Sequence, residues 1–350
     1  MSAGPRPATA LPERTATSEP GFPVELQHAV ERDLEEIRFD GTAATAGLEE
    51  AMRYSLLAGG KRVRPVLALA TAEAVGRAPA EVLPLAAALE LVHTYSLIHD
   101  DLPAMDDDDL RRGRPTCHVA YGEGVAILAG DGLFAEALRL LLERQSGPPE
   151  RVLAAARELV AAAGVAGMVG GQYLDITDEG GADRESLRAL HALKTGRLIG
   201  ASVECVLLLS GLGEAETAPY RRFAGELGVL FQIVDDILDL TATEEQLGKP
   251  AGHDLVEGVY TLPVIRTLAS GLPAATALAA MLGKPLGDDE RMATLDIVRR
   301  NEGIEGAVST ARRYVEAAER AGADLPSSES TDALRESARA LVDSVSATAT

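Results

Sequence analysis

Aromatic side chains are scarce in this 350-residue sequence: tryptophan is absent, and aromatic residues make up only 3% of the chain. The core must therefore be built mainly from Leu, Ala, Val and Ile. Apolar residues still reach 46%, which excludes an intrinsically disordered chain. Because alanine and leucine favour helices, the composition predicts an all-α fold.

Cysteine is rarer than the aromatic residues. Cys117 and Cys205 are the only two, which excludes a disulfide framework and makes a reducing, cytoplasmic location the expectation. The first residues lack the apolar stretch of a signal peptide. No uncharged apolar run reaches the roughly 18 residues of a membrane-spanning helix. The nearest run, 198–212, is interrupted by Glu204, so we expect a soluble protein without a membrane span.

Positive charge is also in short supply, and the formal net charge is −21. Such an acidic surface argues against nucleic acid and against an anionic membrane surface as partners. An anionic substrate could be held only by local arginines, lysines or metal ions.

Alternating strand patterns and internal repeats are missing as well. Helical periodicity instead recurs between Gly, Pro or Asp-rich breaks. The clearest helical segments are 24–38, 45–58, 63–76, 80–99, 119–144, 150–170, 185–192, 196–210, 215–240, 256–270, 287–299, 304–321 and 330–346. We expect a flexible tail over 1–21, one helical domain over 22–346 and a frayed end over 347–350.

Of two acidic clusters in the sequence, the second along the chain is Asp235-Asp236-Ile237-Leu238-Asp239, which lies in an apolar stretch. On a helix, positions i, i+1 and i+4 lie close together on one side. We expect this helix to be buried with its carboxylates facing inward, where like charges are costly unless a divalent cation neutralises them. An incomplete set of oxygen ligands suits Mg²⁺ carried in by a phosphate substrate.

The other cluster runs from Asp100 to Asp109, at the end of the apolar helix 80–99. Asp100 and Asp101 would occupy the last turn, Pro103 would break the helix, and Asp106 could curl back toward Asp100. Carboxylates at a helix C-terminus oppose the helix dipole, which again suggests a nearby cation. The run 107–109 is equally well explained as a solvated surface loop.

Lysine is confined to four positions, and three of them lie in Gly-rich or polar motifs. These motifs are Gly59-Gly60-Lys61-Arg62-Val63-Arg64-Pro65, Lys194-Thr195-Gly196-Arg197 and Gly248-Lys249-Pro250, and Arg111-Arg112-Gly113 follows the first acidic cluster. An ammonium group suits one phosphate oxygen and a guanidinium grips two. The combination suggests one diphosphate held through Mg²⁺ and a second held by Lys and Arg alone.

Together these motifs resemble the trans-isoprenyl diphosphate synthase family, from about Gly59 to Pro263. The stretch from Leu97 to Gly113 is similar to the first aspartate-rich motif of short-chain bacterial members, and Phe231 to Asp239 resembles the second. The resemblance implies a single-domain bundle of roughly ten or more helices around a central cavity, with the two motifs facing each other across its mouth. It also implies a homodimer.

The resemblance further implies a role for each matching residue. Several Mg²⁺ ions, bridged to the allylic diphosphate, would be bound by Asp100, Asp101, Asp106, Asp235 and additionally Asp236 and Asp239. That diphosphate or the adjacent carbocation would contact Arg111, Lys194, Thr195, Gln232 and Lys249. Isopentenyl diphosphate would be held by Lys61, Arg64, His93 and Arg112. Gln172, in another family-like motif, would line the cavity. A single histidine such as His93 is as often structural, but its spacing of seven residues places it two turns before Asp100 on the same helix face.

The implied reaction is ionisation of the allylic substrate, attack by the double bond of isopentenyl diphosphate, and loss of a proton. Mg²⁺ and basic residues would stabilise the departing diphosphate. Tyr95 and Ser96, five and four residues before Asp100, would form the floor that limits the product. An aromatic residue there favours farnesyl (C15), with geranylgeranyl (C20) diphosphate close behind.

One departure and three alternatives remain open at this stage. Val259 stands where many relatives have a lysine, and the segment from Gly248 to Pro263 looks more like that of longer-chain polyprenyl synthases. A terpene cyclase would not need Lys61, Arg64 and Arg112. A non-catalytic partner subunit would be expected to lose aspartates that this chain keeps.

Overall fold

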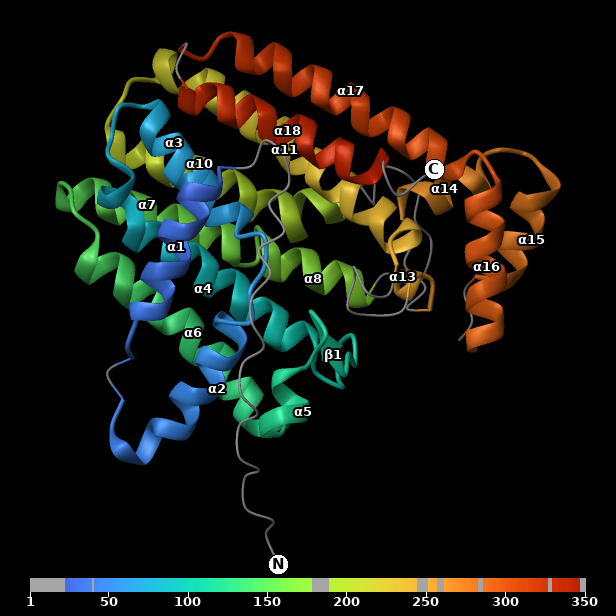
Figure 1. Cartoon of the computed structure of the whole chain (residues 1–350), viewed down its shortest axis with the longest axis horizontal. Helices are drawn as coiled ribbons and strands as arrows, with labels where there is room; N and C mark the ends of the chain where they lie inside the picture. Colours follow the sequence, from blue (N-terminus) through green and yellow to red (C-terminus); the bar gives the residue numbers. More distant parts are fainter. Residues whose placement is uncertain are drawn as a thin grey trace, which may run out of the picture.

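The computed structural model describes residues 23–39, 41–177, 189–243, 251–256, 261–282, 286–326 and 329–346. This part of the chain is almost entirely helical (Figure 1). Its helices are α1 (Val24–Glu36), η1 (Ala43–Thr45), α2 (Ala46–Leu56), α3 (Val63–Ala74), η2 (Pro79–Val82), α4 (Leu83–Asp100), α5 (Cys117–Tyr121), α6 (Glu123–Arg144), α7 (Pro149–Ala163), α8 (Met168–Thr177), η3 (Ala192–Gly196), α10 (Arg197–Ser210), α11 (Glu214–Thr241), α13 (His253–Val256), α14 (Leu262–Leu268), α15 (Pro273–Met281), α16 (Asp288–Arg300), α17 (Gly303–Ala323) and α18 (Glu329–Ser346). The predicted all-α class is confirmed.

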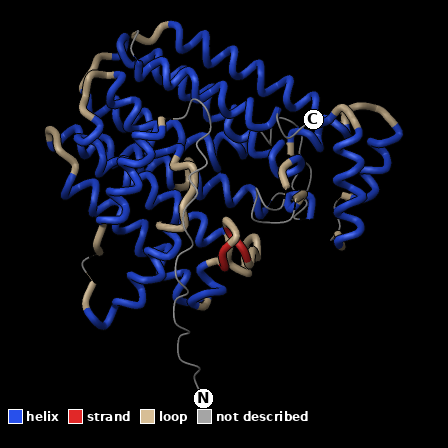
Figure 2. Tube along the Cα trace, in the orientation of Figure 1, coloured by secondary structure: helices blue, strands red, loops and turns tan. Residues whose placement is uncertain are grey.

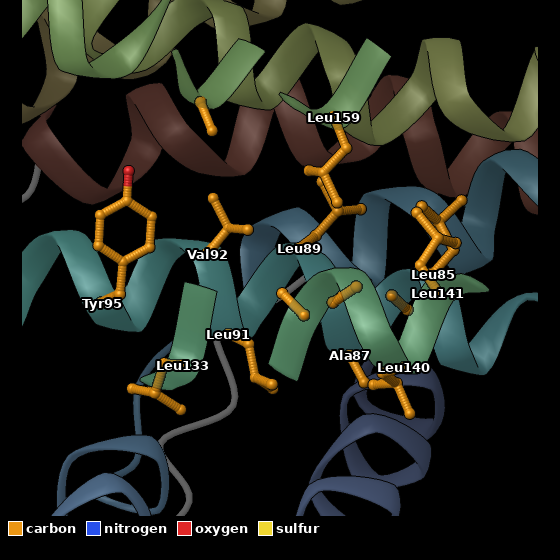
Figure 3. Close-up of a cluster of buried hydrophobic side chains, with 14 of the residues drawn as sticks. Leu85, Ala87, Leu89, Leu91, Val92, Tyr95, Leu133, Leu140, Leu141 and Leu159 are labelled. Carbon is orange, nitrogen blue, oxygen red and sulfur yellow. The ribbon is translucent and has the colours of Figure 1, made fainter. Parts of the chain in front are cut away.

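Helix α4 lies at the centre of one hydrophobic cluster. It begins with a proline in its first turn, where the missing N–H costs nothing, and it packs against α6 and α3. Leu85, Leu89, Val92 and Tyr95 follow one another along α4 at helical spacing, with Leu133 of α6 also in the cluster (Figure 3). Burial on nearly all sides explains why α4 reads as a continuous apolar run rather than an amphipathic one.

The second cluster surrounds the 28-residue helix α11. Helices α17 and α18 pack along α11, and α18 also contacts α3, which joins the two clusters. These two C-terminal helices run beside each other in orange and red in Figure 1. The acidic residues at the end of α4 and on α11 are therefore each carried by a long helix that is held in a core.

The only strands in the described ranges are β1 (Leu110–Arg111) and β2 (Arg114–Pro115), a short hairpin seen in red in Figure 2. Its two-residue turn has Arg112 at φ 54° and Gly113 at φ 71°. Positive φ at both turn positions matches the twist of paired strands. The sequence pattern did not predict this hairpin, because its strands have only two residues each.

Several predicted helix boundaries were wrong, mostly at glycines. The expected helix 119–144 is divided by Gly122, whose φ of 87° favours glycine, into α5 and α6. The expected helix 150–170 ends at Ala163 and resumes at Met168. Helix α15 was not anticipated. The tail 1–21 and the end 347–350 lie outside the described residues, so the domain limits stay predictions.

Two segments are long and apolar enough, by length and composition alone, to cross a membrane: Pro79–Asp100 and Pro149–Thr177. The first is 72% buried, as expected for a core helix, and the second is 44% buried. The second is also interrupted between α7 and α8. The sequence reading, which required an uncharged run, had identified neither.

Candidate active site

The first acidic cluster forms a tight loop at the C-terminus of α4. Asp101 caps the helix, and the backbone N–H of Asp106 donates to the carbonyl of Asp100 at 2.8 Å. Asp107 takes a left-handed conformation, with φ of 53°. The chain thus returns on itself so that Asp106 lies beside Asp100, as the sequence indicated.

Arg111 is clamped by two buried carboxylates of this loop. Its Nε donates to Asp101 Oδ1 at 2.6 Å, and its Nη2 lies 3.6 Å from Asp108 Oδ2. Asp101 and Asp108 are both buried, whereas Asp107 and Asp109 are exposed. The surface-loop interpretation of 107–109 therefore fits two of the three residues and is wrong for Asp108.

The electrostatics of the loop favour a cation. The pKa of Asp100 is raised to about 7, mainly by burial; Lys194 opposes this rise and the neighbouring Asp106 adds to it. Burial likewise raises the pKa of Asp101 against the effect of Arg111. Carboxylates whose charge is disfavoured in this way are stabilised by an added positive charge. The loop therefore has the charge and the oxygen donors that Mg²⁺ requires.

Lys194 reaches the first cluster from the short π-helical segment η3. Its ammonium group is paired with Asp175 of α8, and Asp175, Asp100 and Asp106 together raise its pKa despite burial. Its neighbour Thr195 is buried. Short π-helical segments recur at functional sites because they redirect side chains within a helix.

Glycines let η3 pack closely between two helices. A Cβ on Gly171 of α8 would lie 2.3 Å from the backbone nitrogen of Lys194, and one on Gly228 of α11 would lie 3.3 Å from Cα of Gly196. Larger residues would push the helices apart. The Lys194-Thr195-Gly196 motif is thus held against both α8 and α11.

The second cluster is divided by burial. Asp236 and Asp239 are buried, but Asp235 is exposed, which corrects the expectation that all three face inward. With 3.6 residues per turn, Asp239 lies about 40° and Asp236 about 100° around the helix from Asp235. The edge of the core falls between Asp235 and Asp239, so Asp235 alone of the three is exposed.

Asp236 is held by several donors. Its Oδ1 accepts from Gln232 Nε2 at 3.0 Å, and its Oδ2 accepts from the backbone N–H of Leu262 at 2.9 Å. His191 Nε2 lies 3.7 Å from Oδ1. Both oxygens of Asp236 thereby connect α11 to the start of α14 and to η3, which leaves Asp235 as the more accessible carboxylate of the pair.

The Gly59–Arg64 motif forms the loop before and into α3, called here loop 59–64. Lys61 is exposed, while Arg62 is buried with a left-handed φ of 53°. Arg64 is also buried, and its guanidinium lies 6.0 Å from the ring centroid of Phe231 on α11. Burial lowers the pKa of Arg64, and Glu90 and Asp235 partly restore it. Arg64 therefore lies between α4 and the second acidic cluster.

Arg112 and His93 adjoin the same loop. Arg112 donates to the carbonyl of Gly59. Its guanidinium lies against Gly60, whose φ of 124° favours glycine. Burial lowers the pKa of His93 well below 6.5, and Arg64, Arg112, Arg111 and Arg62 lower it further. These four arginines make the surroundings of His93 positive, and the imidazole is therefore neutral.

Tyr95 is buried one turn before the acidic loop, as the sequence indicated. Its ring contacts Phe134 of α6 edge-to-face at 5.3 Å and His99 at 5.8 Å. Asp100 adds to the rise of the Tyr95 pKa to about 12, which is caused mainly by burial. Ser96 is turned back to its own helix, where its hydroxyl donates to the His93 carbonyl at 2.9 Å.

The structure brings most of the predicted residues together in two adjoining regions. One contains Asp100, Asp101, Asp106, Arg111, Lys194 and Thr195; the other contains Arg64, His93 and Arg112. The α11 residues Gln232, Asp235 and Asp236 form the adjoining wall next to Arg64. Lys249 and Val259 lie outside the described residues. The described non-glycine residues with left-handed φ are Arg62, Asp107 and Arg112, all within this site. Such strained conformations gather at functional sites.

Sequence reading missed Asp175, His191 and Glu90. Asp175 follows Gln172 by three residues and His191 precedes Lys194 by three, so helical spacing places each pair on one face. That spacing was a usable signal. Glu90 is a lone acid in an apolar helix, and burial of such a charge indicates a partner.

The chain is similar to known proteins in both sequence and structure. The sequence matches the family described as "Polyprenyl synthetase" over residues 45–296. It is 46% identical over 247 residues to a farnesyl diphosphate synthase of Geobacillus stearothermophilus, covering 70% of this chain and 82% of that protein.

Two solved structures share the fold. A geranylgeranyl pyrophosphate synthetase from Pyrococcus horikoshii has a TM-score of 0.80 and 33% identity, covering 91% of this chain and 96% of that chain. A polyprenyl synthase from Caulobacter crescentus, complexed with calcium and isoprenyl diphosphate, has a TM-score of 0.79 and 27% identity, covering 94% and 99%.

Proposed function

Because this chain belongs to the polyprenyl synthetase family, we propose that it joins isopentenyl diphosphate head-to-tail to an allylic diphosphate and releases farnesyl or geranylgeranyl diphosphate. The observation that supports this most directly is the arrangement of charge. An acidic loop with Lys194 and Arg111 beside it adjoins a positive site around His93. One diphosphate suits each half.

The acidic half suits Mg²⁺ that arrives with substrate. In the described ranges, no three Asp, Glu, His or Cys side chains already lie close enough to hold a metal ion alone. Burial nevertheless disfavours charge on Asp100 and Asp101. We propose that these two residues, Asp106 and the exposed Asp235 would hold several Mg²⁺ ions, whose remaining ligands are diphosphate oxygens and water. Mg²⁺ would act as a Lewis acid on the departing diphosphate.

The cationic residues divide between the two substrates. Arg111 and Lys194, each oriented by a carboxylate, would hold the allylic diphosphate, with Thr195, Gln232 and Lys249 beside it. Lys61, Arg64, His93 and Arg112 would hold isopentenyl diphosphate. As fixed cations, Arg111 and Lys194 would stabilise the charge that develops on the departing allylic diphosphate without reorganising. The diphosphate released from the allylic substrate is also the base to which the final proton can pass.

Short products are favoured over long ones by Tyr95. The ring is buried against Phe134 directly behind Asp100, where the growing chain would extend. The alternatives of a long-chain synthase and of a non-catalytic partner subunit are less well supported, because neither explains this barrier together with a complete set of motif aspartates.

We also propose a cytoplasmic homodimer. Large apolar side chains are exposed on consecutive helices α5 to α8, including Val119, Leu128, Leu142 and Val160. An apolar surface of this kind commonly marks an interface. The resemblance of the sequence to a dimeric family makes a second copy the expected occupant.

The test is product formation from Mg²⁺, isopentenyl diphosphate and each of the C5, C10 and C15 allylic diphosphates, with chain length read by chromatography. Asp100→Asn and Asp235→Asn should each lower kcat by about 100-fold or more, the scale of losing one preorganised electrostatic group, and a chelator should abolish turnover. Asp107→Asn, which changes an exposed neighbour in the same loop, is the matched control and should stay within about threefold of the parent. Full activity of the Asp100 and Asp235 variants, or activity with chelator present, would refute the proposal.

A further inference from the structure

Loop 59–64 adopts a conformation that its own residues do not favour. Gly59 and Gly60 have φ of 87° and 124°, and Arg62 is left-handed at 53°. A left-handed residue that is not glycine costs about 1–2 kcal/mol. Contacts from outside the loop must therefore hold it in shape.

Arg62 makes those contacts with all three of its nitrogens. Nε donates to Glu31 of α1 at 2.9 Å, Nη1 pairs with Glu90 of α4, and Nη2 donates to the Leu56 carbonyl at 2.8 Å. The side chain is buried, with 3% of Arg62 exposed. Burial lowers its pKa, but Glu90 and Glu31 more than offset this, so the net shift is upward. Each guanidinium nitrogen of Arg62 thus already has a protein partner.

Helix α1 supplies a second contact. Gln27, one turn before Glu31, donates from Nε2 to the Gly60 carbonyl at 3.2 Å. Two polar residues on one face of α1 therefore hold the two sides of Lys61. Helix α1 precedes the residues matched by the family, which begin at residue 45.

We propose that α1 positions the isopentenyl diphosphate half of the site: Gln27 and Glu31, together with Glu90, hold loop 59–64 so that Lys61 and Arg64 meet the substrate. This rests on the proposed function. In this arrangement Arg62, although it lies in a basic motif, binds no phosphate. Glu31, Glu90 and Gln27 are positioning residues rather than catalytic ones.

The experiment compares Glu31→Gln with Glu25→Gln, which removes an exposed carboxylate from the same helix. We expect Glu31→Gln to raise KM for isopentenyl diphosphate about tenfold, since the amide oxygen can still accept from Arg62 but without the negative charge, whose loss is worth about that factor. KM for the allylic diphosphate and kcat should stay within about twofold. Glu25→Gln should match the parent in all three. Equal changes in both KM values, or no change, would overturn the proposal.

Two further measurements test the proposal even if the Glu31→Gln protein folds poorly or has no activity. Gln27→Ala leaves the Arg62 pairs intact and should raise KM for isopentenyl diphosphate about two- to threefold. Limited trypsin digestion reads the loop directly, because cleavage after Lys61 and Arg62 should be faster in Glu31→Gln than in Glu25→Gln. Unchanged cleavage in both variants refutes the role of α1, whereas an inactive parent with accelerated cleavage refutes only the proposed function.

Discussion

A single imidazole shows how strongly the substrate-binding side is charged. His93 has a pKa well below 6.5 because of burial and four nearby arginines. Above pH 6.5 the folded and unfolded chains are both neutral at this position. Below it the unfolded chain binds a proton first, so this group makes the protein less stable as pH falls toward the folded pKa.

This predicts a pH-dependent difference for His93→Gln. Between pH 6.5 and the folded pKa, the free energy of unfolding of the parent should fall by roughly 1.4 kcal/mol per pH unit more than that of the variant. Urea unfolding at several pH values measures it. His28→Gln, at an exposed histidine of α1, should behave as the parent. If the free energy of unfolding depends on pH equally in His93→Gln and in the parent, the pKa of His93 is the same in the folded and unfolded chains and the prediction is wrong.

Tyr95 is the second residue whose role can be isolated. Replacing it by alanine removes the ring that contacts Phe134 behind Asp100, so the product distribution should shift to chains at least one C5 unit longer. Tyr95→Phe retains the ring and should retain the parent distribution. Chromatography of products at equal turnover measures both. If Tyr95→Ala makes the parent product, another residue limits chain length.

Among the elements, η3 is the segment whose placement depends most on close packing. It lies between α8 and α11, and glycines at both contacts make room for its backbone. Since Lys194 faces Asp175 and the acidic loop from this segment, a small displacement of η3 would move the cation away from the leaving group.

Gly171→Ala tests this packing. The added Cβ would lie 2.3 Å from the Lys194 nitrogen, a backbone atom, so α8 and η3 must separate. We expect about 1–3 kcal/mol of destabilisation and at least a tenfold loss of kcat. Gly200→Ala, where nothing lies within 4 Å, should be up to about 1 kcal/mol more stable. Melting curves and turnover of the two variants test this prediction. Equal stability and equal kcat would show that the packing of α8 against η3 is not tight.

At the scale of the whole molecule, the proposed homodimer can be tested on the exposed apolar surface of α5 to α8. Leu128 and Leu142, both on α6, are 56% and 55% exposed, and their spacing of 14 residues places them on one helix face. Leu128→Glu should therefore convert a dimer to monomer at micromolar concentration, as measured by sedimentation. Met292→Glu on α16, 51% exposed in the parent, should leave the dimer intact. A monomeric parent would refute the dimer.

Local patterns were sufficient for the fold class. Helical periodicity located the long helices α4 and α11, because periodicity depends on neighbours within a few turns. The same local chemistry predicted that Asp106 returns to Asp100 and that Tyr95 lies below it. Helix breaks at Gly122 and Gly164 were missed, because glycine only permits a break and packing determines whether one occurs.

Local sequence patterns could not predict which charged side chains pair with one another. Arg62 and Arg64 stand two residues apart in one motif, yet Arg62 is used by Glu31 and Glu90 while Arg64 lies toward Phe231 and Asp235. Asp235 and Asp236 are adjacent, yet one is exposed and the other joins three elements. Composition and periodicity are properties of the chain itself and therefore specify helices and chemistry. Some charged side chains are left to bind a substrate, and others are paired within the protein. Contacts between residues far apart in the chain decide between the two, and these contacts exist only once the helices have packed.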